Sequence, residues 1–146
     1  MKATIPVFLF LIDDHERVYL QRRHQTGYLD GCYEPPAGKV DEGEFPPDAA
    51  CREAMEEAGV LVEVDDIELF HTYMNNSNNK PWLGLMFRTR TWQGVPTIQE
   101  PHKCDDAAFF ALDNLPECTP QVRDGLAKLL VASSIAMDTY SGIAGN

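Results

Sequence analysis

Stretches of apolar residues separated by short polar segments divide this chain into a series of expected strands. Residues 6–12 are almost entirely apolar and predict a buried strand, residues 13–16 predict a turn, and residues 18–22 predict the second strand of a hairpin. Further strands are expected at residues 60–64, 67–74, 82–92 and 107–111, with the asparagine-rich residues 75–79 as a turn. A sheet is therefore expected at the centre of the fold.

Two segments have helical periodicity. Pro46 and Pro47 suit the first turn of a helix over residues 48–58, and Gly59 suits the position just after its end. A second helix is expected to start at Thr119-Pro120, with Thr119 as its cap. Its core-facing residues are expected to be Val122, Leu126, Leu129 and Leu130.

The remaining segments are read as irregular. Residues 26–43 contain several glycines and a Pro35-Pro36 pair, which predicts a loop that lines a site, and residues 138–146 are expected to form a loose tail. Together these elements predict one α/β domain over residues 1–146, with a mixed β-sheet sandwiched between α-helices.

Composition narrows the class of protein. The chain has 146 residues and 44% hydrophobic content, which is ordinary for one globular domain. Its longest apolar run, residues 5–12, is far shorter than the roughly 20 residues of a membrane span. Because the start also lacks the features of a signal peptide, we expect a cytoplasmic protein with no membrane partner.

Cysteine spacing and net charge exclude other classes. The four cysteines lie far apart without a Cys-x-x-Cys pair, so unpaired thiols are expected rather than a zinc or redox site. The formal net charge of −11 would repel a polyphosphate backbone, which makes extended nucleic acid an unlikely partner. A small phosphorylated ligand remains possible if a cation bridges it to carboxylates.

Three glutamates are expected to share one stripe of the first helix. At about 100° per residue, Glu57 lies about 40° to one side of Glu53 and Glu56 about 60° to the other. The apolar residues of this helix occupy a separate arc that is expected to pack on the sheet, namely Ala50, Cys51, Ala54, Met55 and Ala58.

This crowding of carboxylates points to a metal. Like charges three and four residues apart oppose helix formation, and the helix dipole disfavours acids near the helix end. A bound Mg²⁺ ion would offset both effects, because it prefers oxygen ligands and keeps positions for water and phosphate. The alternative is a solvated acidic face without a metal.

The residues around the three glutamates favour a metal site over a solvated acidic face. From Gly38 the chain has five residues before Glu44, seven more before Arg52-Glu53-Ala54, then one residue, Glu56-Glu57, one residue and Gly59-Val60. This pattern resembles the Nudix box at every fixed position, and the flanking strands and final helix resemble the family's sandwich fold. A P-loop is excluded, because Gly38-Lys39 is followed by Val40 and lacks the earlier glycine.

The resemblance implies a hydrolase that cleaves a diphosphate linkage. Glu53, Glu56 and Glu57 would hold Mg²⁺, with Mn²⁺ as an alternative, and the Gly38 carbonyl would add a metal contact. Arg52 would orient a carboxylate of the box through a forked ion pair, with Glu44 as its first candidate partner. The general base would be Glu53 or Glu100, with Asp105 and Asp106 as further candidates, because the loop over residues 95–106 could fold back over the metal site.

Substrate contacts are expected from the strand end and loop before the box. Arginines there could bind phosphate, tyrosines could stack on a base and an aspartate could accept a hydrogen bond, so the candidates are Arg22, Arg23, Tyr28, Asp30 and Tyr33.

A small nucleotide-like substrate follows from the resemblance, and we favour a MutT-like nucleoside triphosphate pyrophosphohydrolase. ADP-ribose pyrophosphatases of the family tend to carry a proline about 16 residues beyond the box, where this chain has residues 74–79 without one. Hydrolysis of an ADP-sugar, ADP-ribose or a dinucleoside polyphosphate remains an alternative, as do a catalytically silent nucleotide-binding domain and a calcium-binding or structural protein. A homodimer is a plausible family-level expectation.

Overall fold

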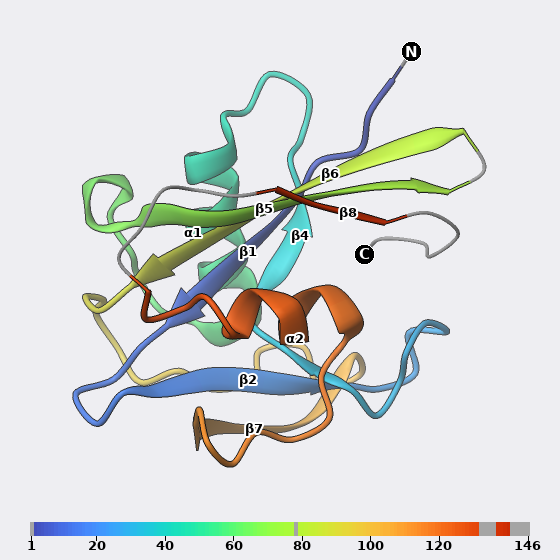
Figure 1. The fold of residues 1–146 in the computed structure, drawn as a ribbon. Coiled ribbons are helices and arrows are strands. Elements are labelled where there is room, and N and C mark those ends of the chain that lie inside the picture. Colours follow the sequence, from blue (N-terminus) through green and yellow to red (C-terminus); the bar gives the residue numbers. More distant parts are fainter. Residues whose placement is uncertain (1, 78, 132–136, 141–146) are drawn as a thin grey trace.

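Strand β1 is the second strand of a five-stranded mixed sheet. The computed structural model describes residues 2–77, 79–131 and 137–140. In spatial order the sheet contains β4 (Ala37–Lys39), β1 (Pro6–Leu11), β6 (Lys80–Thr89), β5 (Glu68–Ser77) and β8 (Met137–Tyr140). The β1/β6 and β5/β8 pairs are parallel and the other two are antiparallel, as Figure 1 shows.

A second, three-stranded sheet lies below the first in Figure 1. Its order is β3 (Tyr33–Glu34), β2 (Arg17–Arg23) and β7 (Cys104–Ala111). The hairpin expected between residues 6–12 and 18–22 is therefore wrong, because β2 pairs along its length with β7 and meets β1 only through an Ile12–Val18 bridge. β1 instead satisfies its backbone groups with β4 and β6, strands that are distant in sequence.

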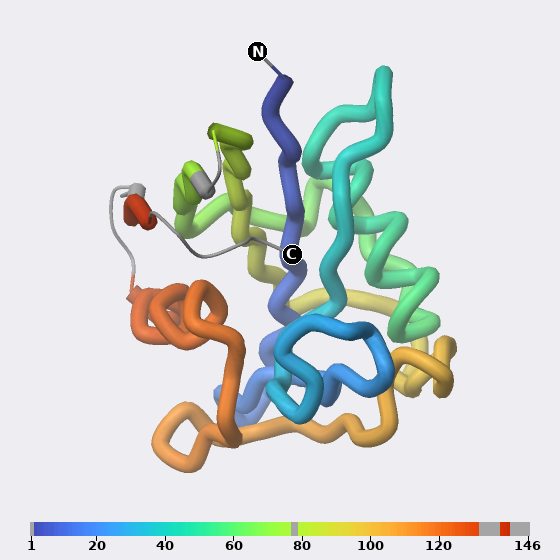
Figure 2. Tube along the Cα trace, turned by 90° about the vertical axis from the view of Figure 1, so that its right-hand side faces the viewer, coloured from blue at the N-terminus to red at the C-terminus, as the bar shows by residue number. Residues whose placement is uncertain are grey.

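The two helices cover opposite faces of the larger sheet, as predicted. Figure 2 shows α1 (Pro46–Ala58, green) on one side of the central strands and α2 (Pro120–Leu126, orange) on the other. Gly59 ends α1 in the left-handed conformation with φ of 71°, which glycine adopts without a steric penalty. Thr119 lies at the start of α2, but its side chain makes no capping hydrogen bond.

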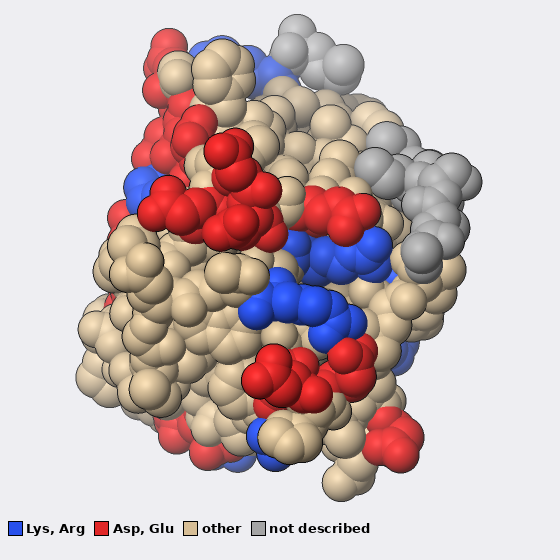
Figure 3. All heavy atoms as spheres, turned by 90° about the vertical axis from the view of Figure 1, so that its left-hand side faces the viewer, with Lys and Arg blue, Asp and Glu red and all other residues tan. Residues whose placement is uncertain are grey.

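One end of the larger sheet carries paired charges. A cavity of about 360 Å³ lies there, lined by residues that include Asp66, Glu68, Arg88 and Arg90. Arg88 Nε is 3.3 Å from Glu68 and Arg90 Nη1 is 2.6 Å from Glu16. Figure 3 faces this side and shows a basic band with acidic surface above and below it. The arginines of this cavity are thus already neutralised by carboxylates.

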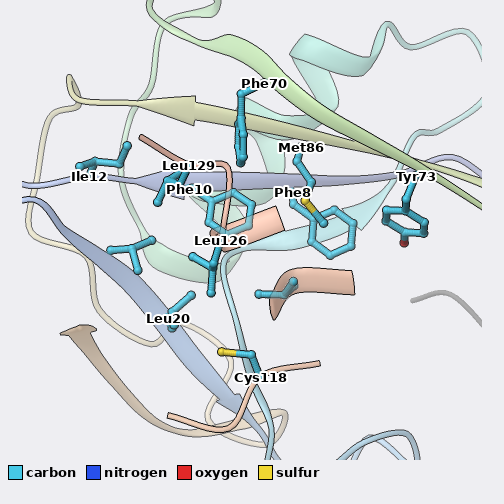
Figure 4. Close-up of a cluster of buried hydrophobic side chains, with 12 residues drawn as sticks. Phe8, Phe10, Ile12, Leu20, Phe70, Tyr73, Met86, Cys118, Leu126 and Leu129 are labelled. Carbon is cyan, nitrogen blue, oxygen red and sulfur yellow. The ribbon is translucent and has the colours of Figure 1, made fainter. Parts of the chain in front are cut away.

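The alternation of side chains along β1 divides the interior into two cores. Val7, Leu9 and Leu11 pack with the alanine face of α1, whereas Phe8 and Phe10 point to the other side. Figure 4 shows the second core, in which Phe8, Phe10 and Met86 face residues of α2 and the lower sheet. Because every residue of β1 is buried, its sequence is apolar throughout rather than alternating.

Several expected boundaries are wrong. Residues 60–64 form no strand but a single Leu61–Gln93 bridge followed by a 3-10 turn, η1 (Val64–Asp66), while Asn75 and Asn76 continue β5 instead of forming a turn. Residues 138–140 are not a loose tail but part of β8; residues 141–146 lie outside the described residues.

Two hydrophobic side chains and part of a loop also differ from expectation. Leu130 is 43% exposed and Met55 is 44% exposed, so neither is in the core. The loop predicted over residues 26–43 contains the short strands β3 and β4.

All four cysteines are free thiols, as expected. Within the described part of the chain, no helix has the length and apolar character needed to cross a membrane.

Candidate active site

Helix α1 presents its acids beside strand β4. Glu53 and Glu57 are half-buried and Glu56 is exposed, whereas Ala50 and Ala54 are buried against the sheet. The division between an acidic and an apolar face is therefore as the helical spacing predicts. The three glutamates nevertheless differ in environment, which spacing alone did not show.

Arg52 is the centre of an ion-pair network on this helix. Its Nε and Nη2 donate to the two carboxylate oxygens of Glu44, at 2.9 and 3.0 Å, in the forked geometry that the resemblance to the Nudix box implies. Its Nη1 donates to Glu53 at 2.8 Å and lies 3.3 Å from Glu56. The Arg52 hydrogen bonds, followed by one from the Asp41 backbone, lower the pKa of Glu44 to about 2.

Gly38 allows β4 to approach Glu53 closely. A Cβ atom placed on Gly38 would lie 2.1 Å from Glu53 Oε1, well inside contact distance. The φ angle of Gly38 is not positive, so the requirement for glycine here is space rather than backbone conformation. Arg52 Nη2 also donates to the carbonyl of the next residue, Lys39, at 3.1 Å.

Glu57 lies deeper in the site than the other two glutamates. Its Oε1 accepts the backbone N–H of Ala37 at 2.5 Å. Burial raises the pKa of Glu57 well above its ordinary value, and the nearby charges of Glu34, Glu53 and Glu100 raise it further. Burial also raises the pKa of Glu53, against the lowering effect of Arg52. Crowded carboxylates of this kind fit a cation.

The loop that contains Glu100 lies against the end of α1. Thr97 and Gln99 donate their backbone N–H groups to the carbonyls of Ala58 and Glu57, at 3.0 and 3.2 Å. Glu100 itself is 3.5 Å from Lys103 Nζ. The loop therefore folds back toward the box, as predicted, while the role of Glu100 as a base stays a prediction.

The carboxylates do not form a ready-made metal site. Among residues 2–77, 79–131 and 137–140, no three histidine, cysteine or acidic side chains are arranged to hold a metal ion. The Nη1 atom of Arg52 lies between Glu53 and Glu56, and Glu57 binds the Ala37 N–H. A metal would need these side chains to turn.

A cavity of about 560 Å³ opens beside the box. Gly38 and Glu57 line it, together with two of the five expected substrate residues, Arg23 and Tyr28. The guanidinium of Arg23 lies 5.3 Å from the centre of the Tyr28 ring and donates to Glu34 Oε1 at 2.7 Å. Acidic, basic and aromatic side chains thus line the same cavity.

The other three expected substrate residues are not among those lining this cavity. Arg22 pairs with Asp105 at 2.7 Å, and Tyr33 donates its hydroxyl to Asp106 at 2.5 Å. Asp30 accepts backbone N–H groups within its own loop, from Thr26 and Gly27. Asp105 and Asp106, which the sequence offered as further candidates for the general base, are thus engaged by Arg22 and Tyr33.

Sequence reasoning missed several lining residues. Trp82 lies on β6 with Lys39 Nζ 5.0 Å from its ring centre, and Glu34, His102 and Lys103 also line the cavity. Glu34 directly follows Tyr33 and Lys39 follows Gly38, so closeness to the box was an available signal. Nothing in the sequence placed Trp82 beside Lys39, because that contact joins two strands far apart in the chain.

Comparison with known families agrees with this geometry. A family described as NUDIX domain matches residues 2–130. The chain belongs to the NUDIX domain family. As a Nudix hydrolase, it acts on phosphoric anhydride bonds.

Solved Nudix structures share the fold. A MutT NUDIX hydrolase from Burkholderia pseudomallei is 27% identical, with a TM-score of 0.78 over 88% of this chain and 98% of that chain. A mutator MutT protein from Bacillus halodurans is 19% identical, with a TM-score of 0.77 over 94% and 89%. An ADP-ribose pyrophosphatase from Streptococcus suis is 16% identical, with a TM-score of 0.61 over 94% and 99%. The last two show likeness of fold alone.

Proposed function

We propose that this Nudix hydrolase converts a nucleoside triphosphate to a nucleoside monophosphate and pyrophosphate, with Mg²⁺ or Mn²⁺. The supporting observation is a cavity of about 560 Å³ that adjoins Glu57 and Gly38 of the box, the arginine Arg23 and the aromatic residues Tyr28 and Trp82. Its volume lies within the range of about 300–1,000 Å³ that is common for small-molecule sites.

The metal ligands in this proposal are the carboxylates of Glu53, Glu56 and Glu57 and the carbonyl of Gly38. The donors are all oxygens, which Mg²⁺ prefers, and the raised pKa values of Glu53 and Glu57 reflect negative charge held in partly buried positions. When bound, the metal would neutralise phosphate charge and make a bound water more acidic. Arg52 would act indirectly, by positioning the metal ligands. Because its Nε and Nη2 bind Glu44, its Nη1 is held where it meets Glu53 and Glu56.

The chemical step is a substitution by water at phosphorus. The water oxygen forms a bond to phosphorus, the phosphoanhydride P–O bond breaks, and the pyrophosphate oxygen leaves with the bonding electron pair. A general base accepts the water proton, with Glu53 or Glu100 as candidates. Both lie near Glu57, since the charge of each contributes to its raised pKa.

Substrate contacts are assigned first to Arg23 and Tyr28. Arg23 lines the cavity and would bind phosphate in exchange for Glu34, to which it donates at 2.7 Å, and the Tyr28 ring offers a stacking surface. Asp30 is assigned the supporting role of shaping the loop that carries Tyr28, through its bonds to Thr26 and Gly27. Arg22 and Tyr33 would reach substrate only after releasing Asp105 and Asp106.

Other substrates fit the same chemistry. ADP-ribose, ADP-sugars and dinucleoside polyphosphates also contain a diphosphate beside a nucleoside, and a silent nucleotide-binding domain would use the same cavity. Location in the cytoplasm and assembly as a homodimer remain expectations from the sequence and the family.

The deciding experiment is a substrate panel assayed with Mg²⁺ and Mn²⁺. Canonical and oxidised nucleoside triphosphates, ADP-ribose, dinucleoside polyphosphates and nucleotide sugars are compared by kcat/KM and by product identity. Release of pyrophosphate from a triphosphate, abolished by Glu57→Gln in a protein that still folds, is the expected result. Faster cleavage of ADP-ribose would replace the triphosphate assignment, and binding without any product would indicate a silent domain.

A further inference from the structure

Gln21 of strand β2 is a buried polar residue in the wall of the cavity beside the Nudix box. It is 3% exposed and lines the cavity of about 560 Å³. Its Nε2 donates to the Tyr19 hydroxyl at 2.8 Å and to the backbone carbonyl of Glu57 at 3.0 Å, and its Oε1 accepts the Cys104 thiol at 3.6 Å. Both N–H groups of the amide are thus used inside the protein, so Gln21 has no donor left for a bound substrate.

The contact with Glu57 attaches the end of helix α1 to the smaller sheet. Glu57 is the next-to-last residue of α1, where backbone carbonyls have no partner within the helix. Its carbonyl accepts two hydrogen bonds from outside the helix, one from Gln21 Nε2 and one from the backbone N–H of Gln99 at 3.2 Å. One carbonyl therefore joins α1 to β2 and to the loop over residues 95–103.

The contact with Cys104 attaches the other end of that loop. Cys104 is the first residue of β7, and its backbone N–H donates to the carbonyl of Glu100 at 3.1 Å. Burial raises the pKa of the Cys104 thiol to about 12, so the thiol stays protonated and can donate to Gln21. The loop is thus held at Gln99 and at Cys104, on either side of Glu100. Figure 2 shows this loop (yellow to gold) beside the end of α1 (green).

Gln21 therefore lies between the two carboxylate residues that the proposed mechanism uses. On one side its amide binds Glu57, and on the other it reaches Glu100 through Cys104. Catalytic groups need to be held within about 0.5 Å of their productive positions by neighbours that are themselves fixed by hydrogen bonds. A buried amide with both its donors and its acceptor in use meets this requirement.

We propose that Gln21 is a positioning residue for hydrolysis, whose amide fixes the loop that carries Glu100 relative to Glu57. The inference rests on the proposed function in giving Glu57 and Glu100 a part in the reaction, and it is independent of which nucleotide is the substrate. It adds a residue outside the Nudix box. Because its polar atoms bind protein groups, Gln21 acts through Glu57 and Glu100 rather than on the substrate.

The first test is the kinetics of Gln21→Leu, which removes the amide and keeps a side chain of similar size. With Mg²⁺ and the best substrate of the panel, kcat should fall about 10-fold, because the reacting groups are no longer held in place. KM should change by less than about two-fold, because the amide offers no donor to the substrate. A residue that bound substrate directly would raise KM instead.

The second test is hydrogen exchange, which needs neither metal nor substrate. The backbone N–H groups of Gln99 and Cys104 should exchange about 10-fold faster in Gln21→Leu, since each end of the loop loses a hydrogen-bonded anchor. Cys104→Ala removes only the thiol and should lower kcat by a smaller factor. In the double variant kcat should be no lower than in Gln21→Leu alone, because both substitutions break the same connection.

The matched control is Gln121→Leu. Gln121 is 4% exposed and lies on α2, which covers the opposite face of the larger sheet from α1 (Figure 2). The same substitution there should leave kcat, KM and the exchange at Gln99 unchanged, whatever its effect on stability. If Gln21→Leu fails to fold, Cys104→Ala is compared with this control by the same measurements.

The outcomes separate this inference from the proposed function. If Gln21→Leu hydrolyses triphosphates with wild-type kcat, raises KM instead, or leaves the exchange at Gln99 and Cys104 unchanged, the positioning role is overturned and the proposed function stands. An equal loss of kcat in Gln121→Leu would also overturn it. If ADP-ribose is cleaved faster than triphosphates, the proposed function fails and Gln21→Leu is tested with ADP-ribose. A wild-type protein that hydrolyses no substrate of the panel would overturn both.

Discussion

Arg52 binds both carboxylate oxygens of Glu44, which lies eight residues earlier and just before helix α1. Its Nε is 2.9 Å from Oε2 and its Nη2 is 3.0 Å from Oε1, while Nη1 remains for Glu53 and Glu56. The Glu44 pair thus fixes the plane of the guanidinium and with it the side of the helix on which Nη1 meets the proposed metal ligands.

Arg52→Lys should lower kcat by about 10²-fold, because a lysine cannot bind two oxygens of Glu44 and reach Glu53 together, and small misplacements of reacting groups cost this much. The measurement is kcat and KM with Mg²⁺, alongside circular dichroism to show that the fold persists. Asp41→Asn is the control, since this exposed carboxylate is 3.5 Å from Arg52 but outside the fork. A change of less than about three-fold in Arg52→Lys would contradict the positioning role.

Gly38→Ala should abolish most activity with a smaller effect on folding. The added methyl would displace the Glu53 carboxylate, which is 2.1 Å from the position of the new Cβ, and a displaced ligand should lower both Mg²⁺ affinity and kcat. We expect a loss of at least about 10²-fold in kcat/KM, measured over a Mg²⁺ titration.

Gly43→Ala is the matched control for Gly38→Ala. Gly43 has φ of +80° and open space around it, so alanine there should cost stability through backbone strain and leave activity per folded molecule unchanged. If both variants lost activity in parallel with stability, Gly38 would have no specific relation to Glu53.

The sequence predicted contacts between residues that are close together in the chain, but not contacts between distant strands. Glu44, Arg52 and the three glutamates lie within one short segment. The helical period predicted the shared face of the glutamates, and the resemblance to the Nudix box implied the Arg52–Glu44 contact. Cavity walls built by distant strands were not predictable in this way. Trp82 and Lys39 meet only because β1 lies between β4 and β6, an arrangement that no local pattern encodes.

The strand errors have a similar cause. The order of an apolar strand, a polar turn and a second strand is typical of a hairpin. In the structure, however, β2 forms its hydrogen bonds with the eight-residue strand β7. Asn75 and Asn76 have turn-forming side chains, yet pairing with Trp82 and Pro81 extends the ladder through them. Tertiary pairing in each case outweighs local preference.

Glu100→Gln tests the identity of the general base. If Glu100 accepts the proton of the attacking water, the amide should lower kcat by at least about 10²-fold with little change in KM, and the acidic limb of the pH–rate profile should disappear. Glu63→Gln, an exposed acid beyond the end of α1, is the control. Activity near that of wild type in Glu100→Gln would leave Glu53 as the candidate, because its charge also acts on Glu57.

His71 should make the stability of the protein fall as the pH is lowered. It is fully buried, and burial followed by the charge of Lys128 lowers its pKa below the usual value of 6.5, despite the raising effects of Asp138 and Asp124. The unfolded chain therefore binds a proton at a higher pH than the folded protein does. Stability is unaffected above about pH 6.5 and decreases as the pH falls from there toward the folded-state pKa, by at most about 1.4 kcal/mol per pH unit.

Denaturant unfolding of wild type and His71→Gln between about pH 7.5 and about pH 5.5 measures this effect. The difference in unfolding free energy between the two proteins isolates His71, because groups that titrate in the same way in both proteins contribute equally. The stability of wild type relative to His71→Gln should fall with decreasing pH, whereas His15→Gln, which alters an exposed histidine, should run parallel to wild type. Because Asp138 belongs to β8 and lies 3.0 Å from His71, a difference that rose with decreasing pH would mean that the ion pair outweighs burial. In that case acid would tighten the attachment of β8 to the sheet instead of weakening it.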